Sequence, residues 1–196
     1  MPARFDGATD MHPPPDLTTA RTRIRLPRED DAQRLLDYRL INRDHLSPWE
    51  PVREASYYTL QGCTRNIAEQ IAAAQADRAY PLLVLDPGES GILASFTFAN
   101  VTRGVFQACH LGYGIAAAWQ GQGLMFEALE AGLDWAFHDL GLHRVMANYM
   151  PHNRRSERLL LRLGFEREGY ARSYLRIDGQ WRDHVLMSLL HPDARD

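Results

Sequence analysis

Apolar residues recur at helical spacing in two early segments of the chain. Residues 27–42 begin with Pro27 and an acidic first turn, and both features are typical of a helix start. Residues 64–77 carry isoleucines four positions apart, the spacing of one helix face, and Thr64 is the expected N-cap. Between these helices, residues 46–51 contain two prolines that break the pattern. We therefore expect a loop there, either between helices or over a site.

Other segments show the alternation that strands require. In residues 22–26 one isoleucine stands between arginines, as in a strand with a single buried face. Residues 80–86 and 91–100 are two further strand-like runs, separated by a turn that contains proline and glycine. A third run, residues 104–116, follows directly. Three strands in succession predict an antiparallel meander.

The second half of the chain predicts two helices and three strands. The first helix has a continuous apolar face and ends at a glycine, and a strand at residues 143–150 follows it. The next helix has Asn153 where an N-cap belongs and Gly164 where a left-handed C-cap belongs. Two strand-like runs near the C-terminus are joined at Asp178-Gly179, which is a hairpin signal.

Length and composition favour one domain. The chain has 196 residues, of which 45% are hydrophobic, and this is enough for one core of ordinary size. Residues 21–190 contain no linker or repeat, so we expect a single domain there. Residues 1–20 are rich in Pro, Asp and Thr and are expected to be a flexible lead-in, with residues 191–196 as a short tail.

The charge balance argues against several classes of partner. A formal net charge of -3 gives no global basic field of the kind that drives nonspecific binding to nucleic acids or membranes. We see neither a secretory leader nor a run of about 18 apolar residues. Cys63 and Cys109 form no CxxC pattern, so no disulfide framework is expected. These features predict a cytoplasmic protein without membrane or direct nucleic-acid partners, and they leave its oligomeric state open.

All 22 basic residues are arginines. A chain without lysine cannot form a lysine Schiff base, anchor pyridoxal phosphate or grip a phosphate through a P-loop lysine. None of the eight histidines falls into an HExxH or another ligand pattern, so no metal site is expected.

A glycine-rich turn at residues 120–125 precedes a predicted helix. Free amides at a helix start, the positive end of the helix dipole and the lack of Cβ atoms make such a turn an anion site, with a phosphate as natural occupant. Its backbone N–H groups can act without a lysine. A dinucleotide fingerprint GxGxxG would begin at Gly121, but Phe126 stands where the third glycine belongs. The match to a dinucleotide fingerprint is therefore weak, and the lack of lysine already excludes a P-loop.

The turn resembles the coenzyme A turn of the GNAT acetyltransferases, Gln/Arg-x-x-Gly-x-Gly/Ala. The six residues of this turn are Gln120, Gly121, Gln122, Gly123, Leu124 and Met125. Gln120 and Gly123 match the pattern, whereas Met125 departs at its last position. The resemblance extends over about residues 21–190. It is strongest in QGQGLMFEAL, LHRVMANYMPHNRRSERLLLRLGF and EGYARSYLRIDGQWRDHVLMSLL, which are similar to the GNAT branch that acetylates protein N-termini. Met125 is normal in that branch.

The resemblance implies a fold and a place for the cofactor. The fold is α/β (α+β), the acyl-CoA N-acyltransferase fold, with a mixed, mostly antiparallel central sheet flanked by helices. Acetyl-CoA inserts where the strand ending at Ile115 and Ala117 splays from the strand at residues 144–150, and it uses free backbone amides there. By the same resemblance, Asn153 bonds the pantetheine arm and Ser156 lies near the sulfur. From the residues alone, Asn153 and Ser156 could equally be an N-cap and a first-turn residue.

The expected proton carriers depart from the common GNAT pattern. Many members place a tyrosine at the position of Leu160, so Ser156 is our expected proton donor. Members also often carry a glutamate at the position of Asn148, and Glu50 in the Trp-Glu-Pro loop is our best candidate for the base. Glu50 could also be a solvated loop carboxylate. An α-amino group titrates near pH ~8 and a lysine near ~10.4, a difference worth roughly 3 kcal/mol. An N-terminal amine can therefore react with a weak base or an ordered water.

The resemblance also implies the acceptor. We expect transfer of an acetyl group to the N-terminal α-amine of a protein, with the N-terminal alanine of a ribosomal protein as the leading candidate. Two alternatives stay open at this point. The acceptor could be a small-molecule amine, or the protein could be a non-catalytic module that senses acyl-CoA or assists ribosome assembly.

Overall fold

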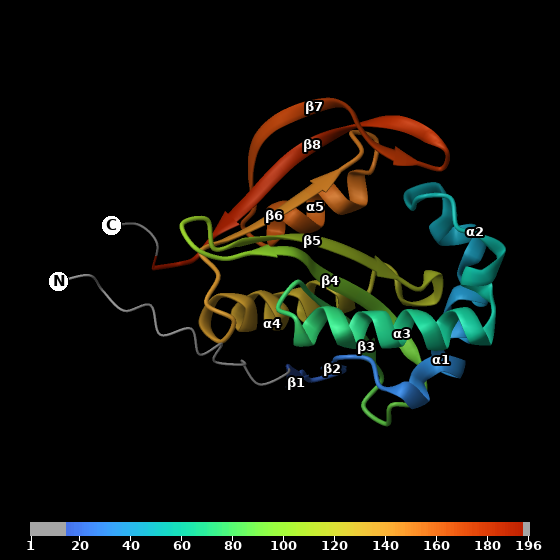
Figure 1. The fold of residues 1–196 in the computed structure, drawn as a ribbon. Helices are drawn as coiled ribbons and strands as arrows, with labels where there is room; N and C mark the ends of the chain where they lie inside the picture. The colour runs from blue at the N-terminus through green and yellow to red at the C-terminus, as the bar shows by residue number, and fades with distance from the viewer. Residues whose placement is uncertain (1–14, 194–196) are drawn as a thin grey trace.

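A computed structural model describes residues 15–193 of the chain, with one eight-stranded sheet at its centre (Figure 1). The strands are β1 (Asp16–Thr18), β2 (Arg23–Arg25), β3 (Ala79–Leu85), β4 (Ile92–Thr102), β5 (Ala108–Ile115), β6 (Arg144–Tyr149), β7 (Glu166–Ile177) and β8 (Gln180–Leu190). The α-helices are α1 (Ala32–Ile41), α2 (Arg43–Leu46), α3 (Leu60–Gln75), α4 (Leu124–His138) and α5 (Arg154–Arg162), with short 3₁₀ turns η1 (Glu29–Asp31), η2 (Ser47–Trp49), η3 (Ala55–Tyr58) and η4 (Ala117–Trp119). The strand order is β1-β2-β3-β4-β5-β6-β8-β7.

The sheet is antiparallel except at one place. β5 and β6 run parallel, and their paired register ends at Leu111 and Ala147. β5 continues to Ile115 and β6 to Tyr149 without further pairing between them, so the two strands separate over this length. The mixed, mostly antiparallel sheet, its meander β3-β4-β5 and the splay between β5 and β6 confirm the fold expected from the sequence.

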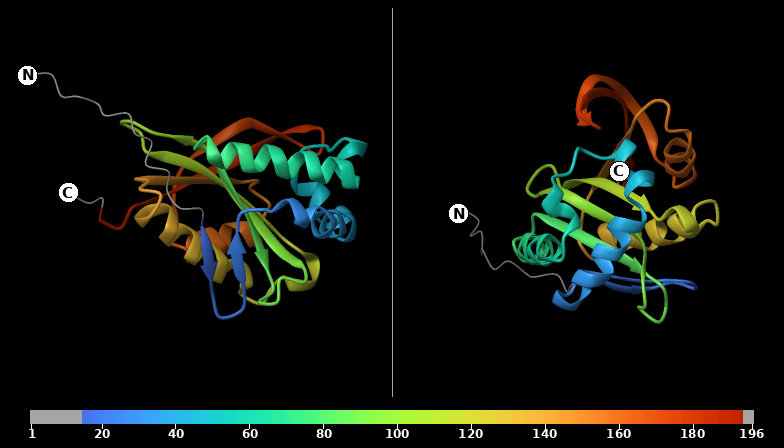
Figure 2. Two further views of the ribbon diagram at one scale, coloured as in Figure 1. Left: turned by 60° about the horizontal axis from the view of Figure 1, so that its bottom comes forward. Right: turned by 90° about the vertical axis from the view of Figure 1, so that its right-hand side faces the viewer.

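The helices cover the two faces of the sheet, as the views in Figure 2 show. Leu82 and Val84 of β3 lie in the core that α4 and Leu160 of α5 help to form. The alternate residues Leu83 and Leu85 pack with α1 and α3 instead. Successive residues of a strand point to opposite faces, so one strand supplies both cores.

Local turn chemistry fixes several element ends as expected. Asp178 and Gly179 have φ values of 46° and 71°, as the tight turn between β7 and β8 requires. Gly164 ends α5 with φ of 89°, a conformation that favours glycine. Asn153 caps the start of α5, since its side chain accepts a hydrogen bond from the N–H of Ser156 at 3.1 Å.

Two sequence expectations were wrong in detail. Thr59, not Thr64, caps α3: its side chain accepts from the N–H of Gly62. Thr64 lies inside the helix and donates to the carbonyl of Leu60 at 3.0 Å. The lead-in predicted for residues 1–20 includes the short strand β1, which pairs with β2 at the edge of the sheet. The rest of that segment up to residue 14 lies outside the described residues.

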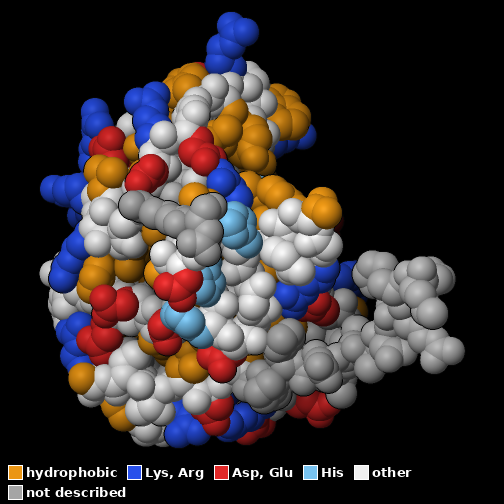
Figure 3. All heavy atoms as spheres, turned by 90° about the vertical axis from the view of Figure 1, so that its left-hand side faces the viewer, with side chains coloured by type: hydrophobic (Ala, Val, Ile, Leu, Met, Phe, Trp, Pro, Cys, Tyr) orange, Lys and Arg blue, Asp and Glu red, His pale blue; other side chains and the backbone are white. Residues whose placement is uncertain are grey.

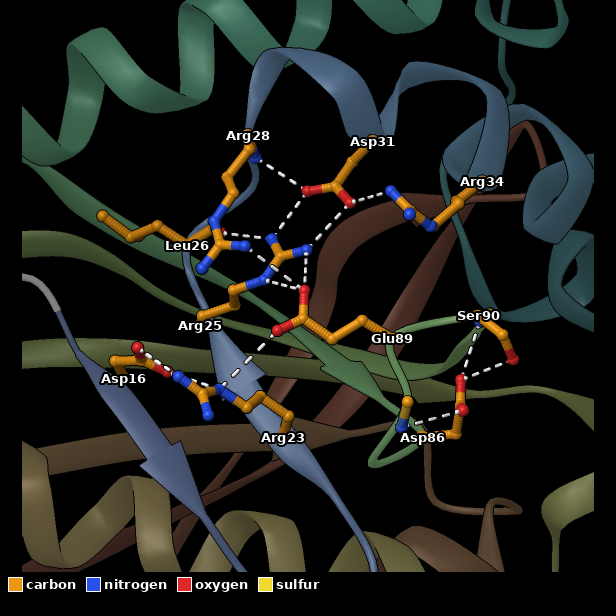
Figure 4. Close-up of polar contacts among 12 residues, drawn as sticks. Asp16, Arg23, Arg25, Leu26, Arg28, Asp31, Arg34, Asp86, Glu89 and Ser90 are labelled. Carbon is orange, nitrogen blue, oxygen red and sulfur yellow. Dashed lines mark hydrogen bonds and ion pairs between the residues drawn. The ribbon is translucent and has the colours of Figure 1, made fainter.

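A buried ion-pair network joins β2 to the start of α1 (Figure 4). Arg25 donates to both carboxylate oxygens of Asp31, at 2.6 and 3.0 Å, and it also reaches Glu89 in the β3–β4 turn at 2.7 Å. Arg25 is 3% exposed and Asp31 is fully buried. Burial opposes ionisation of Asp31, but the bonds from Arg25 and from the N–H of Arg28 hold the pKa of this carboxyl below its ordinary value. The network therefore fixes the first turn of the helix that walls one side of the groove described below.

Candidate active site

The glycine turn opens directly into the N-terminus of α4. Gly121 and Gly123 both have φ of 74°, which a residue with a side chain rarely adopts. Gly123 is the N-cap of α4 and supplies no capping side chain, so the first amides of the helix have no side-chain acceptor at that residue. A Cβ added at Gly121 would meet nothing within 4 Å, which means that the turn faces open space. Uncapped amides beside open space suit an anionic group.

Arg21 supports this turn from a distant part of the chain. Its guanidinium donates to the carbonyl of Gln122 at 2.9 Å and to the carboxylate of Glu127 at 2.7 Å. The backbone N–H of Arg21 also donates to Glu127 at 3.1 Å. The turn is thus held to the segment before β2 as well as to its own helix.

Gln120 connects the turn to two other elements. Its side-chain oxygen accepts a hydrogen bond from Arg155 of α5, and its amide nitrogen lies 2.9 Å from Nε2 of His45 in α2. Arg155 lies on the groove with two more arginines of α5, Arg158 and Arg162. Arg155 bonds the turn itself, and the guanidinium of Arg162 lies 3.9 Å from the centroid of the Phe126 ring in the first turn of α4, so this end of the groove is suited to phosphates.

The backbone at the end of β5 faces the splay. The N–H of Ala116 donates to the carbonyl of Leu93, so Ile115 pairs with Ala94 in a non-hydrogen-bonded register. In that register the N–H of Ile115 points away from β4 and toward the gap beside β6. The N–H of Ala117 is different, because it donates to the side chain of Asn42 at 2.9 Å. The expectation of a free amide is therefore wrong for Ala117, whose amide is already bonded, whereas a role of the Ile115 amide in cofactor binding stays a prediction.

A single groove runs through the splay and past both faces of the sheet. Its volume is about 1440 Å³. The walls include the glycine turn, Asn153 and Ser156 of α5, Tyr38 of α1, Glu50 of the loop before α3, and Tyr174 of β7. The structure thus brings together most of the site residues expected from the sequence.

Ser156 lies beside a residue that the sequence analysis did not identify. The hydroxyl of Tyr113 in β5 is 2.6 Å from Oγ of Ser156, and both residues line the groove. Burial raises the pKa of Tyr113 to about 12, although the bond to Ser156 acts in the opposite direction. Leu160, at the position where many relatives carry tyrosine, is fully buried in the core. A tyrosine hydroxyl therefore reaches this site from the sheet rather than from the helix.

Glu50 also lines the groove, and its charge acts on Tyr38 of α1. Its carboxylate accepts from Nε of Arg53 at 3.2 Å, and its main-chain oxygen accepts from the N–H of Asp178 at 2.9 Å. The second bond attaches this loop to the turn between β7 and β8. Burial raises the pKa of Tyr38, and the charge of Glu50 adds to the shift. Asn148 also lines the groove, as an uncharged amide on β6.

Three histidines line the groove: His45, His110 and His184. Burial lowers the pKa of His110 and of His184, both of which line the groove. A different face, shown in Figure 3, carries several histidine and acidic side chains. Within residues 15–193, His138, His191 and Asp193 can bring one ligand atom each within 4.8 Å of one another. Sequence spacing did not predict this set. It lines no part of the groove, and Nδ1 of His191 already accepts from the N–H of Asp193 at 3.1 Å.

The fold and site together match one protein family. The acetyltransferase (GNAT) domain profile matches residues 21–166, so the chain belongs to the GNAT acetyltransferases. It is an N-acetyltransferase, and its cofactor is acetyl-CoA. No helix within the described residues is long and apolar enough to cross a membrane.

Several relatives resemble the chain over nearly its full length. It is 50% identical over 177 residues to the [ribosomal protein uS5]-alanine N-acetyltransferase of Escherichia coli, covering 90% of this chain and 91% of that protein. The crystal structure of ribosomal-protein-S5-alanine acetyltransferase from Vibrio fischeri has a TM-score of 0.87 and 35% identity, and the match covers 92% of this chain and 99% of that one. Mycobacterium smegmatis RimJ in complex with CoA-disulfide has a TM-score of 0.83 and 30% identity, with 89% and 84% covered.

Proposed function

We propose that this enzyme acetylates the N-terminal α-amine of a ribosomal protein, and that the acceptor begins with alanine. The observation that carries the proposal is the 50% identity to the uS5-alanine N-acetyltransferase of E. coli over 90% of the chain. The groove adds support, because it passes through the splay and has room for an extended peptide end on the face covered by α1 and α3.

The residues of the groove fit coenzyme A. When bound, acetyl-CoA supplies an acetyl group activated as a thioester. Backbone N–H groups of Gly121, Gly123, Leu124 and Met125, which line the groove, would hold the pyrophosphate, with the α5 arginines lining the same groove. Gln122 does not line the groove, and the N–H of Gln120 lies 3.4 Å from the carbonyl of Ala117. Asn153 would bond the pantetheine arm while keeping its role as the cap of α5. The exposed backbone beyond Gly123 is the structural feature that makes this fit, since a side chain there would block close approach.

Three residues have distinct chemical tasks in this proposal. The N–H of Ile115 stabilises the thioester oxygen as negative charge develops on it. The hydroxyl of Ser156 supplies a hydrogen bond to the sulfur, which would leave as a thiolate. Glu50 receives the proton of the amine, directly or through one water.

A weak general base is sufficient for the proposed acceptor, because an α-amine is less basic than a lysine side chain. Many relatives carry a glutamate on β6 where this chain has Asn148, which lines the groove. The amide of Asn148 cannot accept a proton from the amine as a carboxylate would. About a tenth of an α-amine with a pKa near 8 is neutral at pH 7, whereas a lysine is far more protonated. Selectivity for an N-terminus would therefore follow from acid-base chemistry as well as from shape.

Mass spectrometry on matched peptides tests the proposal. The first peptide begins with alanine and contains no lysine. The second differs from it by a blocked N-terminus and one internal lysine. The third differs from the first only in beginning with leucine. We expect acetylation of the first peptide, none of the second and a much slower reaction of the third. Spermidine and other small amines form a parallel series. Turnover of a small amine without turnover of the alanine peptide would contradict the proposed acceptor and leave only the acetyltransferase class.

A further inference from the structure

We propose that Tyr113 is a positioning residue, which donates a hydrogen bond to Ser156 and thereby directs the hydrogen of the serine hydroxyl toward the sulfur of coenzyme A. This inference rests on the role proposed above for Ser156. It assigns a task to a residue on β5 that lies on the other side of the splay from α5.

Ser156 is held on two sides by its neighbours. Its N–H donates to Oδ1 of Asn153 at 3.1 Å, which fixes the backbone at the start of α5. Its Oγ lies 2.6 Å from the hydroxyl of Tyr113. Both side chains are partly buried and line the groove, so the pair spans the gap between helix and strand where the cofactor inserts.

The direction of the Tyr113–Ser156 bond follows from the acidity of the two hydroxyls. Each hydroxyl has one hydrogen and can also accept. A phenol is more acidic than an alkyl alcohol and is therefore the better donor. With Tyr113 as donor, the hydrogen of Ser156 is not used in this bond and can point to another acceptor in the groove. With the reverse direction, the hydrogen of Ser156 would be used in this bond, and the free hydrogen would belong to Tyr113 instead.

Tyr113 is suited to keep its proton while it donates. Burial raises its pKa to about 12, and the nearby Tyr149 of β6 acts in the same direction. A thiol titrates near pH ~8.5, so a thiolate is too weak a base to remove the proton of Tyr113. Tyr113 therefore orients the donor and stays neutral, and Ser156 is the group that meets the sulfur.

The inference predicts a property of bound coenzyme A that needs no acceptor. A hydrogen bond to a thiolate favours the charged form and lowers the pKa of the thiol. The affinity for coenzyme A should then rise with pH through the thiol range, relative to the affinity for desulfo-coenzyme A, which lacks the titrating group. Calorimetry with both ligands between about pH 6.5 and 9.5 measures this ratio.

We expect the ratio of the two affinities to rise about tenfold for the unmodified enzyme, which corresponds to about one pKa unit. Tyr113→Phe keeps the ring and should remove most of this rise, and Ser156→Ala should remove all of it. The double variant should behave like Ser156→Ala alone, because Tyr113 acts through the serine. Tyr170→Phe is the matched control: this tyrosine bonds Asp183 at 2.6 Å, lies outside the groove and should leave the ratio unchanged.

The outcomes separate this inference from the proposed acceptor. A flat ratio in the unmodified enzyme, or an unchanged rise in Tyr113→Phe with unaltered melting temperature, would overturn the role of Tyr113. If no peptide is acetylated but the affinity ratio rises with pH as expected, the acceptor proposal is overturned and the role of Tyr113 is supported. Kinetics give a second readout, since Tyr113→Phe should lower kcat and leave KM for acetyl-CoA nearly constant.

Discussion

The side chain of Asn42 accepts the N–H of Ala117 at 2.9 Å, across 75 positions of the sequence. Its own amide donates to the carbonyl of Tyr38 at 2.9 Å, and the residue is only 3% exposed. One buried amide thus joins the end of α1 to the segment that leads from β5 into the glycine turn. The wall of the groove and the cofactor turn are positioned by the same residue.

Replacing Asn42 should therefore affect stability and cofactor binding together. Asn42→Ala leaves the partly buried N–H of Ala117 without its acceptor, and we expect a loss of about 0.5–1.5 kcal/mol in the free energy of unfolding. Asn42→Asp keeps an acceptor for Ala117 and is the matched control. Urea unfolding and calorimetry with coenzyme A measure both effects. An Asn42→Ala variant with unmodified stability and affinity would show that the bond has no role in positioning the turn.

Gly123 offers a test of the cofactor turn with a close control elsewhere. Gly123→Val should raise the Kd for coenzyme A at least about tenfold, because the side chain would stand at the backbone that meets the pyrophosphate. The substitution also forces a branched residue to a φ of 74°. Gly104 has a φ of 73° between β4 and β5 and does not line the groove. Gly104→Val should lose comparable stability and keep its affinity, whereas equal affinities in the two variants would place the pyrophosphate elsewhere.

Glu50 is tested by removing its charge. If Glu50 receives the amine proton, Glu50→Gln should lower kcat/KM for the alanine peptide by about 10²-fold. Glu54→Gln is the control, since Glu54 is exposed and lies outside the groove. Initial rates across the neutral pH range provide the measurement. Equal rates in both variants would assign the proton to solvent instead.

The buried pair Arg25–Asp31 predicts how stability depends on pH. The pKa of Asp31 is lower in the folded protein, so its contribution is complete above its unfolded pKa near ~3.9 and is lost as pH falls through the folded value. Asp31→Asn should cost about 3–5 kcal/mol at pH 7, because it removes one partner of a buried pair.

Urea unfolding at neutral and acid pH checks this prediction. The difference between the unmodified protein and Asp31→Asn should narrow below about pH 4. Asp16→Asn breaks the exposed pair with Arg23 and should leave the free energy of unfolding nearly unchanged at any pH. A difference for Asp31→Asn that stays constant down to acid pH would assign the loss to packing rather than to charge.

Structural features that depend only on adjacent residues, such as helix caps and tight turns, were predictable from the sequence. Asn153 caps the helix that begins directly after it, and Asp178-Gly179 turns the chain within two residues. The cap of α3 was misplaced because the isoleucines that mark the helix face lie in the middle of the helix, so their spacing does not locate its first turn. In the fold, Gly62 lies inside the first turn of the helix, where a Cβ would collide with the carbonyl of Ser56. Its lack of a side chain serves packing rather than a helix end.

Contacts between distant segments were not predictable. Nothing around Tyr113 in the sequence distinguishes it from other aromatic residues in strands, and its partner Ser156 is 43 positions away. The same holds for Arg21, which reaches Gln122 across 101 positions. The resemblance implied that the backbone N–H of Ala117 is free. In the structure this N–H donates to the side chain of Asn42, at the end of α1. The fold decides which backbone groups remain available for a ligand.

The bond between Asp178 and Glu50 gives the groove a closed rim on one side, because it joins two loops that are each continuous with the body of the protein. Both partners of this bond are main-chain atoms, so it does not depend on the side chain of either residue, unless proline replaces Asp178. The loop that carries Glu50 is therefore fastened to the C-terminal hairpin by the backbone itself. The place of the candidate base is in this respect a property of the fold, and it can persist while the side chains around it change.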